Sequence, residues 1–340
     1  MRRLRFLTLC IAALGCLSVT LLASTAPTEA FGQAIFVIAG FALLWGVQIP
    51  TSLFYWKSVW WLYGVTFCGL LVTLFLGKLS HGAVRWLPIG PVHIQVSEIA
   101  KPVFALVLAA FIEHYTLATQ KNILLYFLLI GGFFVPIFLQ PDLGSALVIL
   151  VTALVLLFIS VKRLPMLIPW LVIGVVAIVG TWSFLLYPYQ RDRLLSFAGT
   201  GNASYNARQA LITVGSGKLF GRGLGHGVQS QLRFLPEYHT DFFFASLSEE
   251  LGLTGVATVF ILYGTFFYLI ASSVSRASTG TQLFIIGFLA AFFFQAAVHI
   301  GMNMRLFPIT GIPLPFLSSG GSSFLSLCIG SGVALRLLRE

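Results

Sequence analysis

Long apolar runs alternate with short polar or glycine- and proline-rich stretches along the whole chain of 340 residues. A transmembrane helix needs about 20 apolar residues to cross ~30 Å of hydrocarbon, and about ten runs have that length. They cover residues 5–24, 34–54, 58–77, 98–117, 123–139, 143–161, 165–186, 241–270, 281–304 and 319–337. The pattern predicts an all-α, polytopic membrane protein of about ten transmembrane helices in one domain, 1–340, with a large extracytoplasmic loop between helices seven and eight at about 187–240.

The composition agrees with a membrane protein. Hydrophobic residues make up 58% of the chain and charged residues only 9%, whereas soluble domains are about 25% charged. The first run follows Met-Arg-Arg-Leu-Arg, as in a secretory signal peptide, but it is longer than the apolar part of such a peptide. Residues 13–16, ALGC, are an imperfect lipoprotein-processing sequence. We therefore expect the first helix to be retained rather than cleaved.

Lysine and arginine residues in the short loops predict the orientation, because they favour the cytoplasmic side of a membrane. With ten spans, one side receives both termini and the basic residues Arg2, Arg3, Arg5, Lys57, Lys121, Lys162, Arg163, Arg276, Arg336 and Arg339. The other side receives the loops 25–33, 78–97, 187–240 and 305–318. We expect both termini to be cytoplasmic and these four loops to be extracytoplasmic.

The predicted outer face also carries positive charge. The loop 187–240 holds six basic residues against Asp192 and Glu237, and Lys78, Arg85 and Arg305 lie on the same face. Long loops escape the positive-inside rule, which is one explanation of the excess. The other is an anionic ligand on that face. We expect no nucleic acid partner, because the basic residues are scattered between spans rather than arranged along a soluble surface.

The first polar cluster is RWLPIGPVHIQVSEIAKPVF, Arg85–Phe104. Its prolines and glycine interrupt a helix, and Ser97 is placed to cap the helix that follows. Glu98 and Lys101 are three residues apart, so they can pair on one helix face. Such a pair can neutralise itself, which lets the helix start below the headgroups, or it can shape the floor of an anion site. Arg85 is a candidate for the same site.

The second cluster, QPDLGS (Gln140–Ser145), separates two short apolar runs and predicts a tight outer turn. Asp142 can cap the following helix and stabilise its positive end. The alternative is a carboxylate beside a cation site. Gln140 is a further candidate for the lining of the outer cavity.

Glycines are frequent in the third cluster, Tyr205–Phe242, where GSGK invites comparison with a phosphate-binding P-loop. The comparison fails, because Ile212 stands where the first glycine of that motif belongs and Leu219 where a serine or threonine follows the lysine. We expect instead an irregular outer loop whose backbone amides and basic side chains reach phosphates. The candidate side chains are those of Arg193, Arg208, Lys218 and Arg222.

The fourth cluster, Met302–Ser323, places three prolines and three glycines between two apolar runs. Such backbone survives at membrane depth only when it is buried in protein or lines a wet cavity. We therefore predict a re-entrant or tightly packed segment and an outer cavity between helices. Its candidate lining residues are Ser318, Gly320, Gly321 and Ser322.

Carboxylates are rare in this chain, yet PEYHTDFFFASLSEELG (236–252) has Asp241 at the start of an apolar run and Glu249 and Glu250 inside it. Thr240 or Asp241 is a suitable helix N-cap. The other interpretation is chemical. At the boundary of water and membrane, a partly desolvated carboxylate holds a proton more readily, as a general base requires. His239 is a candidate beside it, and the two glutamates are expected to be buried pairing residues.

In this order, the clusters resemble the SEDS family of shape, elongation, division and sporulation proteins, from about helix two to the C-terminus. The motifs that carry the resemblance are RW…GP…Q-x-SE-x-AK, QPDLG, GSG…G-x-G-x-G, LPE-x-HTDF…EELG and P-[IV]-TG-[IL]-PLPF-[IVL]-S-x-GGSS. The chain departs from the family at Val96, usually a proline, at His299, frequently an asparagine, and at Ser319, frequently a tyrosine. Its loop 197–205 is also short. These departures bear on substrate gating and partner contacts rather than on activity.

The resemblance implies a ten-helix peptidoglycan glycosyltransferase that polymerises lipid II outside the bacterial cytoplasmic (inner) membrane. It implies two kinds of partner, a class B penicillin-binding protein that crosslinks the glycan and the elongation or division machinery. It places the essential aspartate of the family on Asp241 and its ion pair on Glu98 and Lys101. Asp241 would take the proton of the acceptor 4-hydroxyl, whose oxygen attacks the donor with inversion while undecaprenyl pyrophosphate leaves. Basic outer residues would stabilise that leaving group, with a divalent cation (Mg²⁺ or Mn²⁺) as the candidate cofactor.

QSQLRFLPE (229–237) and the short N-terminus favour the elongation-type, rod-shape branch of the family over the division-type, septal branch. A lipid II flippase would use the same basic cavity, but a transporter predicts charged residues near the midplane and through to the inner face. Here they concentrate on one face; Glu113, His114, Glu249 and Glu250 are the exceptions. A polymerase of another polyprenyl-linked glycan and a scaffold with purely structural polar residues are the remaining alternatives.

Overall fold

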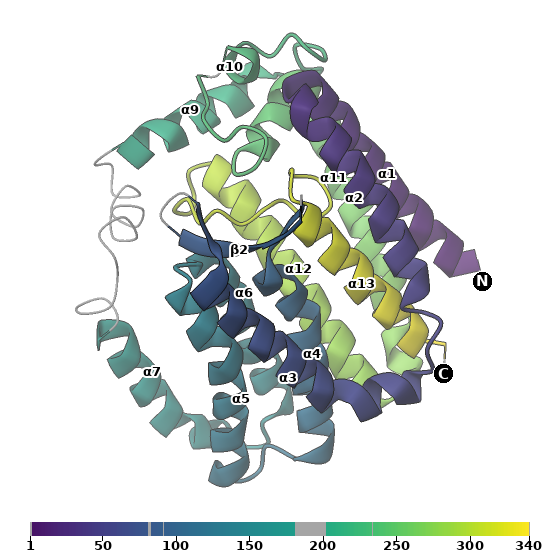
Figure 1. Cartoon of the computed structure of the whole chain (residues 1–340), viewed down its shortest axis with the longest axis vertical. Coiled ribbons are helices and arrows are strands. Elements are labelled where there is room, and N and C mark those ends of the chain that lie inside the picture. Colours follow the sequence, from purple (N-terminus) through teal and green to yellow (C-terminus); the bar gives the residue numbers. More distant parts are fainter. Residues whose placement is uncertain (1, 81–82, 91, 181–201, 233, 340) are drawn as a thin grey trace.

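Helices form wherever the chain is apolar over several turns. The structure, a computed structural model, describes residues 2–80, 83–90, 92–180, 202–232 and 234–339 (Figure 1). Its longer helices are α1 (Arg2–Thr25), α2 (Pro27–Gly46), α3 (Ser52–Leu76), α4 (Val96–His114), α5 (Gln120–Leu139), α6 (Leu143–Ser160), α7 (Ile168–Gly180), α9 (Asn202–Ser216), α11 (Phe243–Ala271), α12 (Thr279–Asn303) and α13 (Gly321–Leu337). The shorter elements are β1 (Lys78–Ser80), β2 (Ala83–Ile89), β3 (Val92–Ile94), η1 (Leu164–Leu167), α10 (Val228–Gln231) and η3 (Val274–Arg276).

Each of the ten predicted spans overlaps one of these helices, although the second, 34–54, extends past the end of α2 into α3. In the described part of the chain, seven combine membrane-spanning length with high hydropathy: α1, α2, α3, α5, α6, α11 and α12. The helix α4 carries Glu98, Lys101 and Glu113, α13 has 17 residues, and the described part of α7 has 13. The protein is therefore an integral membrane protein, and the count of ten spans stays a prediction.

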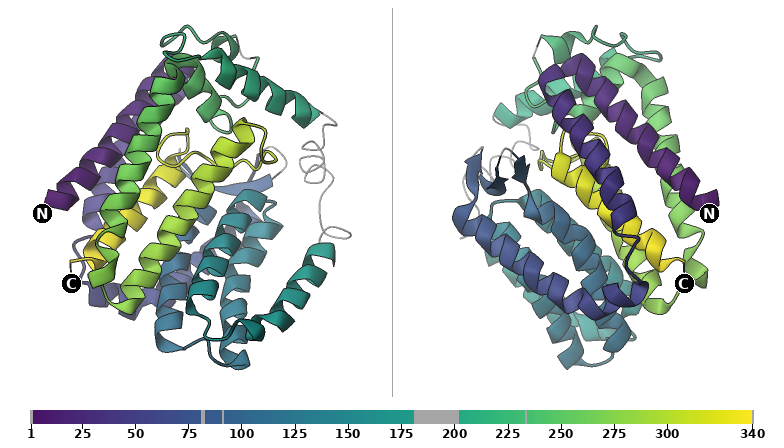
Figure 2. Two further views of the ribbon diagram at one scale, coloured as in Figure 1. Left: turned by 180° about the vertical axis from the view of Figure 1, so that it is seen from behind. Right: turned by 45° about the vertical axis from the view of Figure 1, so that its right-hand side comes forward.

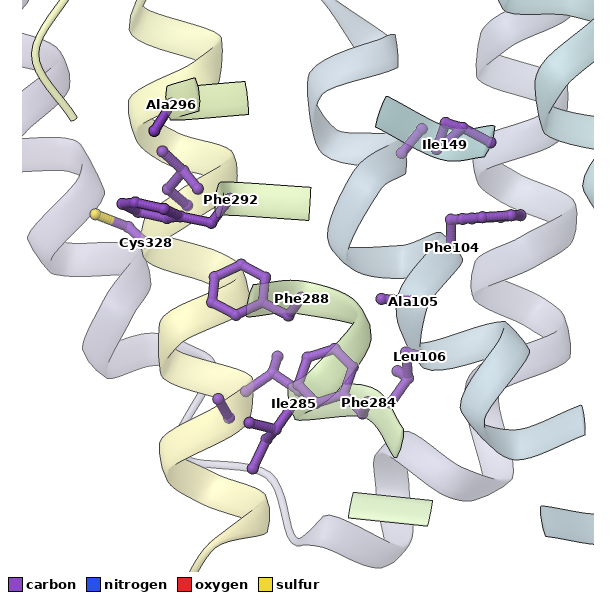
Figure 3. Packing of buried hydrophobic residues seen from close by; sticks show 14 of the residues in the cluster. Phe104, Ala105, Leu106, Ile149, Phe284, Ile285, Phe288, Phe292, Ala296 and Cys328 are labelled. Carbon is purple, nitrogen blue, oxygen red and sulfur yellow. The ribbon is translucent and has the colours of Figure 1, made fainter. Parts of the chain in front are cut away.

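The helix α4 occupies the centre of the bundle, where it packs against α3, α5, α6, α12 and α13. Nine consecutive residues, 104–112, are buried, which is typical of a helix surrounded on all sides. Figure 3 shows Phe284, Phe288 and Phe292 of α12 between α4 and α13. These aromatic side chains bring α12 and α4 together, so polar groups at one end of both helices are held in fixed register.

Polar turns collect at one end of the bundle, which we call the loop end. It contains the sheet, the α5–α6 turn, α9, α10 and the segment 304–320 (Figures 1 and 2). The chain termini and the basic residues used to predict the orientation belong to the opposite end. There the Nε of Arg336 donates to the carbonyl of Pro50 (2.6 Å), which ties the end of α13 to the α2–α3 turn.

One prediction about the loop end is wrong, and one predicted loop contains strands. The expected loop 25–33 is a single-residue break, because α1 ends at Thr25 and α2 already begins at Pro27. Proline favours the first turn of a helix, and the polar residues after it bind a neighbouring segment inside the protein. The region 78–97 forms a small antiparallel sheet in the order β1-β2-β3, with Leu87 opposite Ile94.

The predicted outer loop 187–240 is also more regular than expected. Its described part contains the helix α9 and the single turn α10. Figure 2 shows α9 lying across the end of the bundle at which α11 begins. The small buried residues Ala207 and Ala210 join Phe242 and Ala245 in one cluster. Residues 181–201, which include Arg193, lie outside the described residues.

Candidate active site

Asp241 lies in a tight turn, Glu237–Phe242, which we call the HTD turn. The backbone amides of Thr240 and Phe242 both donate to the carbonyl of Glu237, at 3.2 and 3.1 Å. The helix α11 begins at Phe243 with Phe242 as its N-cap, and the Phe242 side chain makes no capping hydrogen bond. The prediction that Thr240 or Asp241 caps this helix is therefore wrong. Asp241 itself is partly exposed.

Three successive carbonyls of the HTD turn accept hydrogen bonds from outside it. The carbonyls and their donors are His239 with the Ser319 amide (3.0 Å), Thr240 with the Ser318 hydroxyl (3.0 Å) and Asp241 with the Asn303 side-chain amide (3.1 Å). The carbonyl of the Asn303 side chain also accepts from the Ala245 amide (3.1 Å). The end of α12 and the residues before α13 thus fix the backbone that carries the carboxylate.

Two of those donors belong to residues 312–320, which we call the PLPF segment. It is buried from Leu314 to Ser318, and side chains of neighbouring helices satisfy its backbone carbonyls. The pairs are Ile312 with His299 Nδ1 (2.7 Å), Pro313 with Gln295 Nε2 (3.0 Å) and Pro315 with the Tyr263 hydroxyl (2.5 Å). The prediction of a tightly packed, non-helical segment is confirmed.

The glycines and serines expected to line an outer cavity serve this packing. A Cβ at Gly321 would overlap the ring of Phe36 on α2. The amide of Gly320 donates to Gln33 (3.4 Å), and the hydroxyl of Ser322 accepts from the Gln95 amide (2.9 Å). These residues therefore join α2 and the start of α4 to the base of the PLPF segment.

The Glu98–Lys101 pair is formed as predicted and is buried. Lys101 Nζ lies 2.6 Å from Glu98 Oε1, and the two residues are 6% and 2% exposed. Lys101 also donates to Gln295 Oε1 (3.0 Å) on α12. An adjoining cavity of about 10 Å³, partly lined by Ser326, has room for about one water molecule. The ammonium group thus meets a carboxylate and an amide oxygen, as a buried charge requires.

The predicted cap of α4 is wrong, whereas that of α6 is confirmed. Gln95 is the N-cap of α4 without a side-chain bond, and the Ser97 hydroxyl instead donates to Asp142 Oδ2 (3.0 Å). The same oxygen accepts from Gln95 Nε2 (2.9 Å), and Asp142 Oδ1 caps α6 by accepting from the Ser145 amide (3.2 Å). Protein donors thus occupy both oxygens, which favours the cap over the cation site.

Charge stabilises the ionised form of Asp142. Burial acts to raise the pKa of this carboxyl, but the positive charge of Arg85 and the hydrogen bond from Ser145 outweigh it and hold the pKa below 3.8. The guanidinium of Arg85 also donates to the Pro141 carbonyl. Gln140 is buried, and its amide donates to the carbonyl of Leu70 (2.7 Å). This cluster therefore fixes the α5–α6 turn against β2 and α3.

The glycine-rich loop binds α11 rather than presenting its amides outward. The amides of Arg222 and Gly223 donate to the carbonyls of Glu249 and Glu250, at 2.9 and 3.0 Å. At Gly252 (φ +63°) the helix is broken, and a Cβ there would overlap the loop backbone. The expectation that these amides reach phosphates is therefore wrong, and close backbone contact explains the glycines.

Glu249 and Glu250 are buried, as predicted, and their carboxylates accept hydrogen bonds from other elements. Glu249 accepts from the Gln229 and Ser230 amides (2.9 and 3.1 Å) and from the Ser230 hydroxyl (2.9 Å). Glu250 accepts from the Ser24 hydroxyl (2.7 and 2.9 Å) on α1. The two carboxylates thus tie the loop and α1 to the first turns of α11.

The described basic candidates of the outer loop lie on the surface. Arg208 on α9 and Lys218 are exposed. The Arg222 side chain is 42% exposed, with its Nε 3.9 Å from Glu249. Arg208 follows Ala207, which packs in the same cluster as Phe242 of the HTD turn. These cations therefore remain open to an anionic ligand from outside.

The family model for FtsW, RodA and SpoVE cell cycle proteins matches residues 2–340. The chain belongs to this family. A probable peptidoglycan glycosyltransferase FtsW of Thioalkalivibrio sulfidiphilus is 36% identical over 327 residues, which cover 91% of this chain and 80% of the relative. The peptidoglycan glycosyltransferase MrdB of Escherichia coli K12 is also 36% identical, over 306 residues covering 85% and 80%.

Solved structures of the FtsW/RodA/SpoVE family have the same fold. One comes from work on the "structural coordination of polymerization and crosslinking by a peptidoglycan synthase complex". It matches with a TM-score of 0.84 at 27% identity, and the match covers 98% of this chain and 96% of that one. A mutant of the rod shape determining protein RodA from Thermus thermophilus matches with a TM-score of 0.75 at 27% identity over the same shares.

The divalent cation predicted above would need oxygen or nitrogen ligands. Within the ranges that the structure describes, no three His, Cys, Asp or Glu side chains are grouped so that they could hold a metal ion. A cation would therefore need the substrate, or residues outside those ranges, as ligands. It stays a prediction, and no chemical step below depends on it.

Sequence reasoning missed the amides that hold the site. Gln33, Gln295 and Asn303 are each at most 2% exposed, and each bonds to a residue of another element. Gln295 and Asn303 lie inside the apolar run 281–304, where a polar side chain is costly unless it is satisfied, whereas Gln33 falls in the predicted loop 25–33. A polar amide inside an apolar run was therefore the sequence signal for such a buried contact.

Proposed function

We propose that Asp241 is the general base with which this peptidoglycan glycosyltransferase polymerises lipid II into β-1,4 glycan strands at the outer face of the bacterial cytoplasmic membrane. The name of the enzyme class is that of its relatives in T. sulfidiphilus and E. coli. One observation carries the proposal: three successive backbone carbonyls, 239–241, are held from other elements while the Asp241 side chain is partly exposed. A carboxylate on a rigid backbone is suited to proton transfer.

The reaction balances with the substrate alone. The Asp241 carboxylate takes the proton of the acceptor GlcNAc 4-hydroxyl as that oxygen forms a bond to the anomeric carbon of the donor. The bond from this carbon to the pyrophosphate oxygen breaks with inversion from α to β, and undecaprenyl pyrophosphate leaves with the electron pair. The activated bond belongs to the donor, so no nucleotide is required.

The leaving pyrophosphate gains negative charge in the transition state, and preorganised cations lower the energy of such a state. Arg208, Lys218 and Arg222 supply exposed positive charge at the loop end. We assign them to the pyrophosphates of donor and acceptor. Because these side chains are exposed, their effect is expected to weaken with salt.

We propose a class B penicillin-binding protein as the partner that crosslinks the product. A structural relative with a TM-score of 0.84 was solved as a peptidoglycan synthase complex in which polymerisation and crosslinking are coordinated.

We propose a role in cell elongation, on the basis of QSQLRFLPE (229–237). The septal role is the second candidate, since both an FtsW and the MrdB relative are 36% identical to this chain. Complementation distinguishes them. Rescue of rod shape in cells depleted of an elongation-type polymerase supports elongation, and rescue of septation alone assigns the protein to division.

The test of Asp241 is its replacement by asparagine, which keeps the size but cannot accept the proton. Loss of a general base typically lowers a rate about 10²–10⁴-fold. We expect Asp241→Asn to accumulate and bind its penicillin-binding partner, yet to make no glycan from labelled lipid II in proteoliposomes. Glu113→Gln, an equivalent carboxylate-to-amide change near the end of α4 farthest from the loop end, is the control and should polymerise normally. Activity of Asp241→Asn within a few fold of the wild type would move the base elsewhere.

A further inference from the structure

We infer that Gln295 is a positioning residue for the reaction, because it connects the buried Glu98–Lys101 pair to the turn that carries Asp241. This inference rests on the proposed function, since it concerns how the same carboxylate is held. It assigns a role to a neutral side chain inside α12.

Both the oxygen and the nitrogen of the Gln295 side-chain amide form hydrogen bonds. It is 2% exposed; its Oε1 accepts from Lys101 Nζ (3.0 Å), while its Nε2 donates to the Pro313 carbonyl (3.0 Å) and approaches the Ser323 hydroxyl (3.4 Å). Lysine can only donate and a backbone carbonyl can only accept. The orientation of the amide is therefore fixed by its partners, and no flipped amide satisfies both.

Pro313 begins a compact turn that ends at the residue holding the HTD turn. The amides of Leu317 and Ser318 donate to the Leu314 carbonyl (3.0 and 3.1 Å), and the Leu314 amide donates to the Ser318 hydroxyl (2.8 Å). That same hydroxyl donates to the Thr240 carbonyl (3.0 Å), one residue before Asp241. The path from Lys101 to the HTD turn is thus a continuous series of hydrogen bonds that passes through the Gln295 amide and the Pro313–Leu314 peptide group.

The connection has a direction that can be tested. The first bond of the path needs an acceptor at residue 295, and the second needs a donor. Gln295→Leu removes both, whereas Gln295→Glu, as a carboxylate, keeps the acceptor for Lys101 and loses the donor to Pro313. If Gln295 serves only to satisfy the lysine, the glutamate variant should behave like the wild type.

We expect both variants to lower kcat for lipid II polymerisation about 10–100-fold, the loss typical of a reacting group displaced by about 1 Å. The KM for lipid II should change little, because Gln295 is buried away from the exposed cations. Amide hydrogen exchange of residues 238–246 should speed up in both variants, while exchange in α5 and α6 stays as in the wild type. Gln282→Leu is the control, since the Gln282 amide of the same helix bonds only to the nearby Ala277 carbonyl (2.8 Å).

Two results would overturn the inference: a kcat of Gln295→Glu within threefold of the wild type, or unchanged exchange of residues 238–246 in both variants. If Gln295→Leu does not accumulate, Gln295→Glu alone decides the question. Asp241→Asn is measured beside them. An active Asp241→Asn contradicts the proposed function, whereas an inactive Asp241→Asn with a normal Gln295→Glu contradicts only the role of Gln295.

Discussion

Polar side chains inside the apolar helices of this protein find their hydrogen-bond partners either in their own helix or in another element. The hydroxyls of Thr20 and Thr258 donate to the carbonyl one turn earlier in their own helix, at 2.8 Å each. The amides of Gln33, Gln295 and Asn303 bond to residues of other elements, and Asn303 donates to the His299 carbonyl of its own helix as well (2.8 Å). A hydroxyl is satisfied locally at little cost, whereas a longer amide side chain reaches a neighbour. The buried amides therefore mark the elements that must be held in register.

Replacing Asp142 by asparagine should give a stability difference that depends on pH. The pKa of Asp142 in the folded protein is lowered from the ordinary 3.8. Its charge therefore stabilises the folded protein above pH 3.8, and this stabilisation is lost as the pH falls through the lowered pKa. Near pH 7 we expect the unfolding free energy of Asp142→Asn to be about 1–3 kcal/mol lower than that of the wild type. The variant should therefore melt at a lower temperature. The gap should narrow toward pH 3 in detergent, and an equal gap at both pH values would contradict this account.

Removing either member of the Glu98–Lys101 pair should be costly. The remaining charge would stay buried without its partner, which typically costs about 3–5 kcal/mol. We expect Lys101→Ala and Glu98→Ala each to lower the amount of folded protein in the membrane and its polymerase activity. Exchanging the two residues keeps one charge of each sign and should restore both quantities in part. If both single variants accumulate and polymerise like the wild type, the pair has neither role.

At the scale of elements, the break in α11 is the feature that periodicity could not predict. The sequence 243–271 is apolar enough for one straight helix, and its predicted span was continuous. Gly252 adopts φ +63°, and the amides after it, Leu253 and Thr254, donate to the carbonyls of Lys218 and Leu219 (3.0 and 3.1 Å). The loop before α11 thus replaces the helical hydrogen bonds that the break removes. Only long-range contact explains this conformation.

The glycine of this break should be intolerant of a side chain. A Cβ at Gly252 would overlap the backbone of Leu219 and Gly221, and an alanine at this positive φ is strained as well. We expect Gly252→Ala to detach residues 217–232, so that limited proteolysis cuts them at least severalfold faster. Gly264→Ala, on the same helix with open space around it, should be neutral or slightly stabilising, since alanine favours helix by about 1 kcal/mol. Equal rates of cleavage of the two variants would contradict this role of Gly252 in holding residues 217–232.

The sequence predicted elements better than their ends. Each of the ten apolar runs overlaps a helix in the described part of the chain, because burial of an apolar surface decides whether a helix forms. The chain near the starts of α2 and α11 is held by partners far along the sequence, since Gly320 bonds to Gln33 and both Ser318 and Asn303 bond to the HTD turn. For the site, the same limit held. The ion pair at i and i+3 is local and was predicted, whereas the carbonyl contacts of the HTD turn join α12 and the segment before α13.

At the scale of the whole molecule, motifs far apart in the sequence meet at one end of the bundle, as Gln95 and Ser322 do across 227 residues. The start of α4 binds Asp142 through Gln95 and Ser97, and it binds Ser322 of α13 through the Gln95 amide. The helix α1 reaches the same end, where Ser18 donates to the Leu317 carbonyl (2.5 Å). A site of this kind tolerates little relative movement of its helices. Its exposed carboxylate and cations can then face a substrate without being carried by a flexible loop.

The orientation of this bundle in the membrane gives the last prediction. Basic short loops lie at the end opposite Asp241, so the positive-inside rule places both termini in the cytoplasm and the loop end outside. In a variant without the four natural cysteines, Gly215→Cys at the loop end should react with a membrane-impermeant maleimide in intact cells. Lys162→Cys at the other end should react only after permeabilisation, as should tags on both termini. Labelling of Lys162→Cys in intact cells would invert the topology and remove Asp241 from the compartment in which glycan strands are made.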